Sequence, residues 1–341
     1  MTTPTNQKIT ATAHTNIALV KYWGKADQSL IIPQTDSLSL TLKAFYTTTS
    51  VVFDPRLSSD TITFDGVLAS HDDQEKMSRF LDLVRAQADV SLRAAVTTVN
   101  HVPVAAGLAS SASGYAALAA AASRAAGLNL SRHDLSRLAR RGSGSASRSV
   151  FGGFAAWHRG TDDATSYAYP IDEQPDWDLG VMAVVLDQTT KKISSRTGMQ
   201  RSVATSPFYP AWIEANEQDF DAIQVAIKAH DIESLGQITE HNALRMHALT
   251  LSAEPGFTYF NGATLAAIEL VQQTRQELGG RYYFTIDAGP NVKIIGLRTD
   301  LETQLLPRMQ AHFGAANVLL TAAGPGVTIQ ADNPTGKDLN S

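Results

Sequence analysis

The feature that most constrains the fold of this chain is a strand-like run that leads through a turn of small residues into a helix-forming run. "AAVTTVNHVPVAAG" (94–107) contains several β-branched residues and predicts a strand that ends in a loop. "GLASSASG" (107–114) has three serines, two glycines and no charge, and alanine, the strongest helix former, dominates residues 113–126. Such a turn gathers backbone N–H groups at the positive end of a helix dipole, which favours a phosphate ligand. For the octapeptide alone, a tight turn capped by serines is an equally good interpretation.

A second glycine- and serine-rich segment, "GSGSASRSVFGG" (142–153), repeats this chemistry and adds Arg148. The planar guanidinium of arginine matches both carboxylate and phosphate groups. The first segment is neither a Walker motif, since no Gly-Lys-Ser/Thr follows, nor a dinucleotide fingerprint. Two such segments in one half of a chain predict a phosphorylated substrate together with a nucleotide.

The charge and composition of the 341 residues exclude several classes of protein. Lys and Arg number 28 against 33 Asp and Glu, a net charge of −5 without a basic block, which argues against general nucleic-acid binding. The absence of cysteine excludes disulfides, thiolate metal sites and a cysteine nucleophile, and suits a reducing compartment. The N-terminal segment has no apolar region of the signal-peptide kind, and no 18-residue apolar run occurs. We therefore expect a cytoplasmic protein with neither a membrane nor a nucleic acid as partner.

Strand and helix signals follow one another without a regular rhythm, which predicts an α+β fold. In the first half, strand-like runs occur at 16–24, 37–53 and 61–66, and helix patterns at 73–88, 113–126 and 131–141. In the second half, helix patterns occur near 209–229, 231–249, 261–279 and 300–313. Further strands are expected at 179–188, twice within 282–297 around an Asp-Ala-Gly-Pro turn, and as a pair within 317–329. The predicted units are an N-terminal domain (1–190), a C-terminal domain (191–331) and a loose tail (332–341).

Six segments carry a family resemblance: "AHTNIALVKYWGK" (13–25), "PVAAGLASSASGYAALAAA" (103–121), "RRGSGSASRSVFGGFAAW" (140–157), "KKISSRTGMQ" (191–200), "HNALRMHA" (241–248) and "YFTIDAGPNVK" (283–293). Together, and in this order, they resemble the diphosphomevalonate decarboxylases of the GHMP kinase superfamily. The resemblance implies an N-terminal domain like domain 2 of ribosomal protein S5 and a C-terminal ferredoxin-like α/β sandwich. It also implies an active site in the cleft between these domains, and a homodimer.

The reaction implied by this resemblance begins when ATP, with Mg²⁺ between its phosphates, phosphorylates the 3-hydroxyl of mevalonate 5-diphosphate. The 3-phosphate and CO₂ then leave, and isopentenyl diphosphate enters isoprenoid biosynthesis through the mevalonate pathway. The nucleotide phosphate loop implied by the family is made of Gly107, Leu108, Ala109, Ser110, Ser111 and Ser113.

Three residues are catalytic candidates by the same resemblance. Asp287 is expected to lie near the 3-hydroxyl as the base, although an arbitrary Asp-Ala-Gly more often forms an Asx-turn. Because a carboxyl of ordinary pKa, about 3.9, is a poor base for a tertiary alcohol, we expect orientation first and late proton transfer. Arg148 is expected to orient the substrate carboxylate and also to steady the transferred phosphate, since gripping the carboxylate alone opposes loss of CO₂. Lys192 is expected at the terminal phosphate of ATP, with Lys191 as the competing choice.

The substrate diphosphate is expected to meet a further group, again by resemblance: Tyr22, Lys25, Ser143, Ser145, Arg148, Ser195 and Arg196. Lys21 is left undecided between structure and chemistry. No metal-binding residue is predicted, because His14, His241 and His247 lack ligand spacing with carboxylates and suit structural roles. Thr35 stands where relatives often have asparagine, and it keeps one hydrogen bond but not the donor–acceptor pair of an amide.

Two other functions stay open from the sequence. A kinase of this fold phosphorylates the alcohol and stops, whereas the presence of both Asp287 and Arg148 favours the full reaction. A non-catalytic binding protein that keeps the fold is disfavoured by the net acidity and by the intact polar loops.

Overall fold

The computed structural model describes residues 7–101, 110–187 and 192–331, and its first half is built on an eight-stranded sheet. The central strands β1 (Ile9–Val20) and β4 (Ser37–Asp54) pair antiparallel along most of their length. The order is β14-β1-β4-β7-β5-β6, with β8 paired to β4 and β9 paired to β8. The other strands are β5 (Thr61–Phe64), β6 (Val67–Leu68), β7 (Arg93–Asn100), β8 (Phe154–His158), β9 (Tyr167–Asp172) and β14 (Thr328–Ala331).

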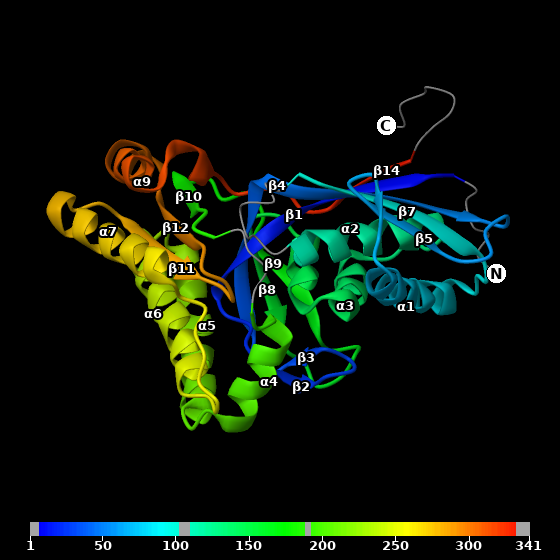
Figure 1. Cartoon of the computed structure of the whole chain (residues 1–341), viewed down its shortest axis with the longest axis horizontal. Helices are drawn as coiled ribbons and strands as arrows, with labels where there is room; N and C mark the ends of the chain where they lie inside the picture. The colour runs from blue at the N-terminus through cyan, green and yellow to red at the C-terminus, as the bar shows by residue number, and fades with distance from the viewer. Residues whose placement is uncertain (1–6, 102–109, 188–191, 332–341) are drawn as a thin grey trace.

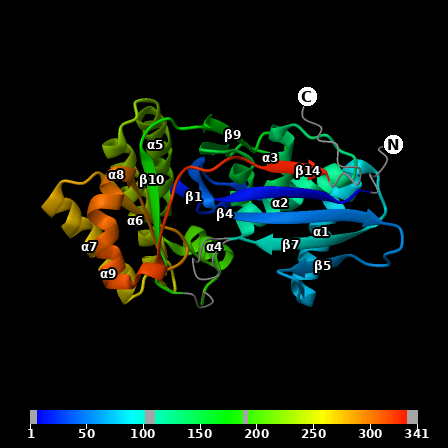
Figure 2. The ribbon, with the colours of Figure 1, turned by 90° about the horizontal axis from the view of Figure 1, so that it is seen from above.

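Three helices cover one face of this sheet: α1 (His71–Ala88), α2 (Ser110–Ala125) and α3 (Arg132–Gly142). In Figure 2, β1, β4 and β7 lie in front of these helices. The alanines of the predicted helix explain the close packing of α2 on β1 and β4, because Ala119–Ala122 have no exposed surface and add no bulk. The helix predicted from residue 131 is present as α3, and Ser131 caps it, since Ser131 Oγ accepts a hydrogen bond from Asp134 N–H.

The second half is built on a four-stranded antiparallel sheet in the order β11-β12-β10-β13. Its strands are β10 (Leu179–Val184), β11 (Tyr282–Ile286), β12 (Val292–Leu297) and β13 (Val318–Thr321). The helices α5 (Tyr209–Lys228), α6 (Ile232–Leu251), α7 (Gly262–Leu278) and α9 (Leu306–Phe313) gather at this end of the molecule (Figure 1). The α+β prediction is confirmed.

Strand β10 is buried on both faces, as its unbroken apolar sequence suggests. Val181 and Ala183 pack in a core with α5 and α6, whereas Met182 and Val184 pack in a core with α7 and α9. The first of these cores also contains Ile17 of β1 and other apolar side chains of the N-terminal sheet. The two halves of the chain are therefore joined by one continuous apolar core.

Sheet pairing joins segments that lie far apart in the sequence at two places. The strands expected as a pair within 317–329 do not pair with each other, because β13 pairs with β10 and β14 crosses over to pair with β1. Strand β10 precedes the predicted domain boundary at residue 190, yet it pairs with β12 and β13. Each of these strands has a partner strand far from it in the sequence, and local periodicity does not reveal such a partner.

The helix expected at 300–313 is divided into α8 (Arg298–Asp300), a π-helical turn η3 (Leu301–Leu305) and α9. Pro307 stands at the start of α9, and its missing N–H interrupts a regular hydrogen-bond ladder. The remaining helical elements of the described residues are two short 3₁₀ turns, η2 (Gly144–Val150) and η4 (Ala315–Asn317), and the helix α4 (Ser195–Thr205). Within the described ranges, no helix combines the length and the apolar character needed to cross a membrane.

Candidate active site

A cavity of about 180 Å³, the central cavity, lies where the two halves meet. Side chains reach it from the end of β1, the start of α2, the η2 turn, α4 and the turn between β11 and β12. Seven residues predicted from the sequence line it: Tyr22, Ser111, Ser143, Ser145, Arg148, Ser195 and Asp287. Segments separated by more than 200 residues therefore meet in one site, as the family resemblance implies.

The carboxylate of Asp287 is held between two lysines. Its Oδ1 accepts a hydrogen bond of 2.8 Å from Lys21 Nζ, and its Oδ2 lies 3.4 Å from Lys293 Nζ. Gly289 N–H donates to the backbone carbonyl of Asp287 at 2.7 Å, so the turn is closed by the main chain. The side chain is 38 % exposed, and this surface faces the central cavity. The geometry thus favours a chemical role for Asp287 over the Asx-turn alternative.

Electrostatics keep this carboxylate ionised. Burial raises the pKa of Asp287, but the positive charges of Lys21 and Lys293 outweigh burial and hold its pKa well below the ordinary range. Burial lowers the pKa of Lys21, and Asp287 opposes that shift. A carboxylate stabilised in this way is an even weaker base than the sequence predicts, which suits it to orienting a hydroxyl more than to deprotonating one.

Strand β11, which leads into Asp287, is fixed from its open edge by side chains of α6 and α7. Glu240 Oε1 accepts a hydrogen bond from Phe284 N–H at 3.2 Å, and Arg275 Nη1 donates to the carbonyl of Tyr282 at 3.1 Å. These contacts replace the missing neighbour strand, because β11 pairs only with β12 among the described residues. The position of Asp287 is therefore set by helix packing as well as by the sheet.

Arg148 is fully enclosed and fixed by polar neighbours. Its Nε donates to Ser39 Oγ at 2.9 Å, its Nη1 to Ser37 Oγ at 2.5 Å and its Nη2 to Asn16 Oδ1 at 3.4 Å. Burial lowers the pKa of Arg148 to about 10, while Asp287 opposes the shift, so the guanidinium stays charged at neutral pH. Because all of these partners are neutral, the guanidinium retains a net charge for a ligand in the central cavity.

A larger hollow of about 770 Å³, the basic cleft, adjoins the central cavity and shares Tyr22, Ser111, Ser143 and Ser195 with it. Lys25 and Arg196 line the cleft, and no described residue forms an ion pair with either of them. Burial and the nearby Arg196 lower the pKa of Lys25, which indicates two cations close together without a carboxylate between them.

The hydroxyl of Tyr22 is buried and has no hydrogen-bond partner among the described residues. A buried hydroxyl without a partner is costly unless a ligand supplies one. Together with the two unpaired cations, Tyr22 makes this end of the basic cleft a candidate anion site.

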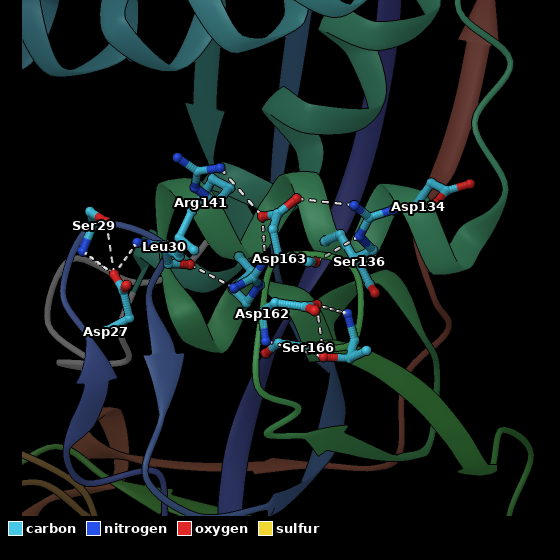
Figure 3. A network of polar contacts seen from close by, with 12 residues as sticks. Asp27, Ser29, Leu30, Asp134, Ser136, Arg141, Asp162, Asp163 and Ser166 are labelled. Atoms are coloured by element: carbon cyan, nitrogen blue, oxygen red, sulfur yellow. Dashed lines mark hydrogen bonds and ion pairs between the residues drawn. The ribbon is translucent and has the colours of Figure 1, made fainter.

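A polar network supports the wall of the basic cleft (Figure 3). Asp163 accepts from Arg140 Nη2 at 2.6 Å and from Arg141 Nη1 at 3.3 Å, both near the end of α3. Arg140 Nη1 also donates to the carbonyl of Leu30 at 2.6 Å. Leu30 lies in the loop between β2 (Lys25–Asp27) and β3 (Ile32–Pro33), and Asp27 closes this loop by accepting from Leu30 N–H. The network therefore fixes the hairpin that carries Lys25.

A third hollow of about 370 Å³, the α2 pocket, is bounded by Phe64, Thr98, Asn100, Lys76 and the first turn of α2. Of the predicted nucleotide loop, Gly107, Leu108 and Ala109 fall outside the described residues. Ser110 is the first residue of α2, and Ser111 lines the α2 pocket, the central cavity and the basic cleft. The start of α2 is thus common to all three spaces.

Two residues predicted for the site, Ser113 and Lys192, do not line any of the three hollows. Ser113 is fully buried, and its Oγ shares hydrogen bonds with Thr47 Oγ1 at 2.8 Å and Thr15 Oγ1 at 3.2 Å, so it anchors α2 to the sheet instead of facing a cavity. Lys192 is exposed just before α4 and is not among the residues that line the three hollows. Lys191 falls outside the described residues.

Several contributors to the site were missed from the sequence, including Asn16, Lys293, Ser37 and Ser39. A lone lysine within the buried strand "VKIIGL" was the available signal for Lys293, because such a charge needs a partner. Ser37 and Ser39 alternate on β4 and so share one face, but only the fold reveals that Arg148 meets that face.

The histidines and Thr35 have structural contacts. His247 Nε2 lies 3.3 Å from the carbonyl of Ile286, and burial together with Lys21 lowers the pKa of His247 to about 3, so the ring is neutral. His14 Nδ1 lies 3.1 Å from the carbonyl of Leu42. Thr35 keeps the single hydrogen bond predicted for it, accepting from Asn216 Nδ2 at 2.9 Å. Over the described ranges, no three acidic or histidine side chains cluster as metal ligands.

Two family models match this chain. The diphosphomevalonate decarboxylase-like N-terminal domain matches residues 13–168, and the mevalonate 5-diphosphate decarboxylase C-terminal domain matches residues 181–331. The diphosphomevalonate decarboxylase of Candida albicans is 33% identical over 92% of this chain and 96% of its own length. The human diphosphomevalonate decarboxylase is 35% identical over 85% of this chain and 76% of its own length.

Solved structures give the same match. The mevalonate diphosphate decarboxylase of Staphylococcus aureus has a TM-score of 0.91 and 43% identity, and the match covers 95% of this chain and 98% of that one. A structure described as MDDEF in complex with MVAPP, AMPPCP and magnesium has a TM-score of 0.91 and 49% identity, covering 95% and 99%. The mevalonate diphosphate decarboxylase of Enterococcus faecalis has a TM-score of 0.89 and 48% identity, with the same coverage.

Proposed function

Because the chain belongs to the diphosphomevalonate decarboxylase family and has the GHMP kinase fold, we propose that the central cavity is its active site. The enzyme uses ATP to decarboxylate mevalonate 5-diphosphate, and it yields isopentenyl diphosphate, ADP, phosphate and CO₂. The observation that carries the site assignment is the ionised Asp287, held between Lys21 and Lys293 and facing a cavity that adjoins both the basic cleft and the α2 pocket.

The substrate diphosphate lies at the end of the basic cleft formed by Lys25, Arg196 and Tyr22, with Ser143, Ser145 and Ser195 as further hydrogen-bond donors. Two cations without carboxylate partners and a buried hydroxyl without an acceptor support this assignment. A diphosphate supplies both the negative charge and the acceptor oxygens that this set lacks. Arg148, deeper in the central cavity, then lies on the side of the substrate carboxylate.

ATP occupies the α2 pocket, and its phosphates point along the start of α2 towards the central cavity. Ser111 lines both spaces, and the helix N-terminus favours negative charge there. Gly107, Leu108 and Ala109 directly precede α2 in the sequence and are further candidates for the phosphates, while Lys192, placed just before α4, is the candidate for the terminal phosphate.

Magnesium suits this arrangement as a partner of the ATP phosphates. The described residues offer a serine hydroxyl at the start of α2 but no cluster of carboxylates, so phosphate oxygens and water must supply most of its ligands. When bound, the ion neutralises charge on the phosphates, and the orienting work falls to Asp287, Arg148 and the lysines.

The chemistry follows from this placement. Asp287 accepts a hydrogen bond from the 3-hydroxyl and orients its oxygen towards the γ-phosphorus of ATP. As the new O–P bond forms, the bond to ADP breaks with its electron pair on ADP, and the hydroxyl proton, now acidic, passes to Asp287. In the second stage, the C3–O bond breaks with its pair on the phosphate. The electron pair between C2 and the carboxylate carbon becomes the new C=C bond as CO₂ leaves.

Arg148 lies on the side of the substrate carboxylate, a group that loses its charge when CO₂ leaves. A contact with the substrate carboxylate alone stabilises the ground state more than the transition state, because CO₂ is neutral. The guanidinium is fixed by Ser37, Ser39 and Asn16, so it orients the carboxylate and also offers charge to the phosphate as that group departs.

The family resemblance also supports a homodimer, and the absence of cysteine supports the cytoplasm as the location. Exposed apolar side chains on α6 and α7, including Leu244, Leu251 and Leu265, offer surface for a second copy. Sedimentation equilibrium of the purified chain tests the dimer, and a monomer at micromolar concentration contradicts it.

The function is tested by incubating the purified protein with ATP, Mg²⁺ and mevalonate 5-diphosphate while ADP and CO₂ are followed together. We expect the two products in equal amounts. Formation of ADP without CO₂ identifies a kinase that stops after phosphorylation. A folded protein that forms neither product supports the non-catalytic alternative.

A further inference from the structure

Lys293 occupies an unusual place for a charged residue. It lies within β12, opposite Thr285 of β11 and Ala183 of β10, in the middle of the four-stranded sheet. Its side chain is 3 % exposed, and the remaining residues of the strand are apolar or glycine. Burying an ammonium group at this place is costly unless charged partners offset the loss of water. Asp287 is one such partner, at 3.4 Å.

Counting donors separates the two lysines that flank Asp287. Each ammonium has three N–H donors. Lys21 uses all three, at 2.8 Å to the carbonyl of Ala18, 2.7 Å to Thr285 Oγ1 and 2.8 Å to Asp287 Oδ1. Lys21 therefore positions the carboxylate and has no donor left for a substrate.

Lys293 forms fewer and longer hydrogen bonds to the protein than Lys21 does. Its two contacts, with the carbonyl of Asn291 at 3.3 Å and with Asp287 Oδ2 at 3.4 Å, are long for charged hydrogen bonds. Among the described residues it has no third partner, and Lys293 lines the central cavity beside Asp287. One N–H is thus available on the side where the proposed reaction brings the 3-oxygen and its phosphoryl group.

Resting on the proposed function, we propose that Lys293 is a further catalytic residue, whose ammonium binds the phosphoryl group as it moves onto the 3-oxygen and then leaves as phosphate. Lys293 makes and breaks no covalent bond. It offers positive charge where negative charge gathers on the phosphate oxygens, first as the O–P bond forms and then as the C3–O bond breaks. Asp287 keeps Lys293 in place while its own Oδ1 stays bonded to Lys21.

The expected loss of kcat on removing the Lys293 ammonium can be estimated from the kind of hydrogen bond that it donates. Removing one preorganised donor from a developing anion in an enclosed site lowers kcat by about 10²–10³-fold. Binding of the substrate itself depends on the diphosphate end, where Lys25 and Arg196 lie, so KM for mevalonate 5-diphosphate stays within about threefold of wild type. A purely structural role for Lys293 predicts instead a loss of folded protein with unchanged kcat per folded molecule.

The test compares Lys293→Met, which keeps an unbranched apolar side chain and removes the ammonium group, with the control Lys228→Met on the exposed end of α5. CO₂ release gives kcat and KM, and circular dichroism with thermal unfolding gives the folded fraction. We expect kcat to fall by about 100-fold for Lys293→Met and to stay unchanged for the control. A kcat within threefold of wild type, or a change confined to KM, overturns the proposal.

A binding measurement keeps the proposal open to refutation if Lys293→Met is only partly folded, because titration counts the competent sites. Affinity is measured for mevalonate 5-diphosphate alone, and for ADP, Mg²⁺ and aluminium fluoride in its presence, a mimic of the phosphoryl group in transfer. We expect the mimic to bind about 100-fold more weakly and the substrate to bind as before. Equal loss for both ligands, or loss for neither, contradicts the proposal. If wild-type protein releases no CO₂, the proposed function fails; if only the Lys293 comparison fails, this inference alone falls.

Discussion

A substitution far from the cavity, Gly236→Ala on α6, tests whether helix packing sets the position of Asp287. Glycine inside a helix is ordinarily less stable than alanine by about 1 kcal/mol, so the change is stabilising by propensity alone. Here, however, a Cβ would overlap the ring of Tyr283 on β11, lying 2.5 Å from Cε2 and nearer to Cδ2 and Cγ. The ring is buried and must move by roughly 1 Å or more to restore ordinary contact, and such overpacking costs about 1–3 kcal/mol.

The expected balance is a protein less stable by about 0–2 kcal/mol, with a thermal midpoint lower by up to about 3 °C. Because Tyr283 and Asp287 are four residues apart on one strand and its turn, the displacement reaches the carboxylate. A misplacement of about 1 Å costs kcat on the order of 100-fold. The control is Gly262→Ala at the first turn of α7, where a Cβ meets nothing within 4 Å and neither property should fall. A Gly236→Ala protein with unchanged midpoint and kcat refutes the reasoning.

Three further predictions follow from the site. Asp287→Ala and Arg148→Ala should both fold and lose most CO₂ release, and normal turnover in either variant removes that residue from the mechanism. Lys25→Met and Arg196→Met should each raise KM for mevalonate 5-diphosphate by about tenfold or more while changing kcat less. The difference in KM between variant and wild type should shrink at high salt, because salt screens the charges. A KM difference that does not depend on salt contradicts an electrostatic role for these two residues. Burial first, then Lys21, lowers the pKa of His247 to about 3, below the value near 6.5 expected when unfolded. The unfolded chain therefore binds the proton more readily, and stability falls by about 2 kcal/mol between pH 6.5 and pH 5. His247→Gln should flatten this pH dependence of the thermal midpoint, and an unchanged slope contradicts the assignment.

Local signals in the sequence were enough for the elements whose causes are local. The helix that follows Ser131, the alanine-rich α2 and the two strands around Asp287 each depend on residues close together in the chain, and each was predicted within a few residues. The π turn η3 was not predicted, because one proline in an otherwise helical pattern does not say whether the helix ends, bends or loosens.

Long-range pairing explains what the sequence left undetermined. The unbroken apolar sequence of β10 indicates a buried strand but does not tell which sheet buries it, so its pairing with β12 and β13 could not be read from the sequence. The candidate site also contains some residues that could be predicted from local motifs and others that could not. The motif containing Asp287 was recognised, whereas the donor count that distinguishes Lys21 from Lys293 required coordinates, since Ala18 and Thr285 meet only in the fold.

The pairing of β1 with β14 has a consequence for biosynthesis. Ile9 lies opposite Ala331, so the N-terminal sheet receives its outermost strand from residues translated more than 300 positions later. While the ribosome is still extending the chain, the outer edge of β1 has no neighbour and its backbone donors and acceptors are open to other chains. A nascent chain at this stage can therefore bind a chaperone, and a stop codon in place of Thr328, which removes β14 and all residues after it, should leave that edge exposed and favour aggregation.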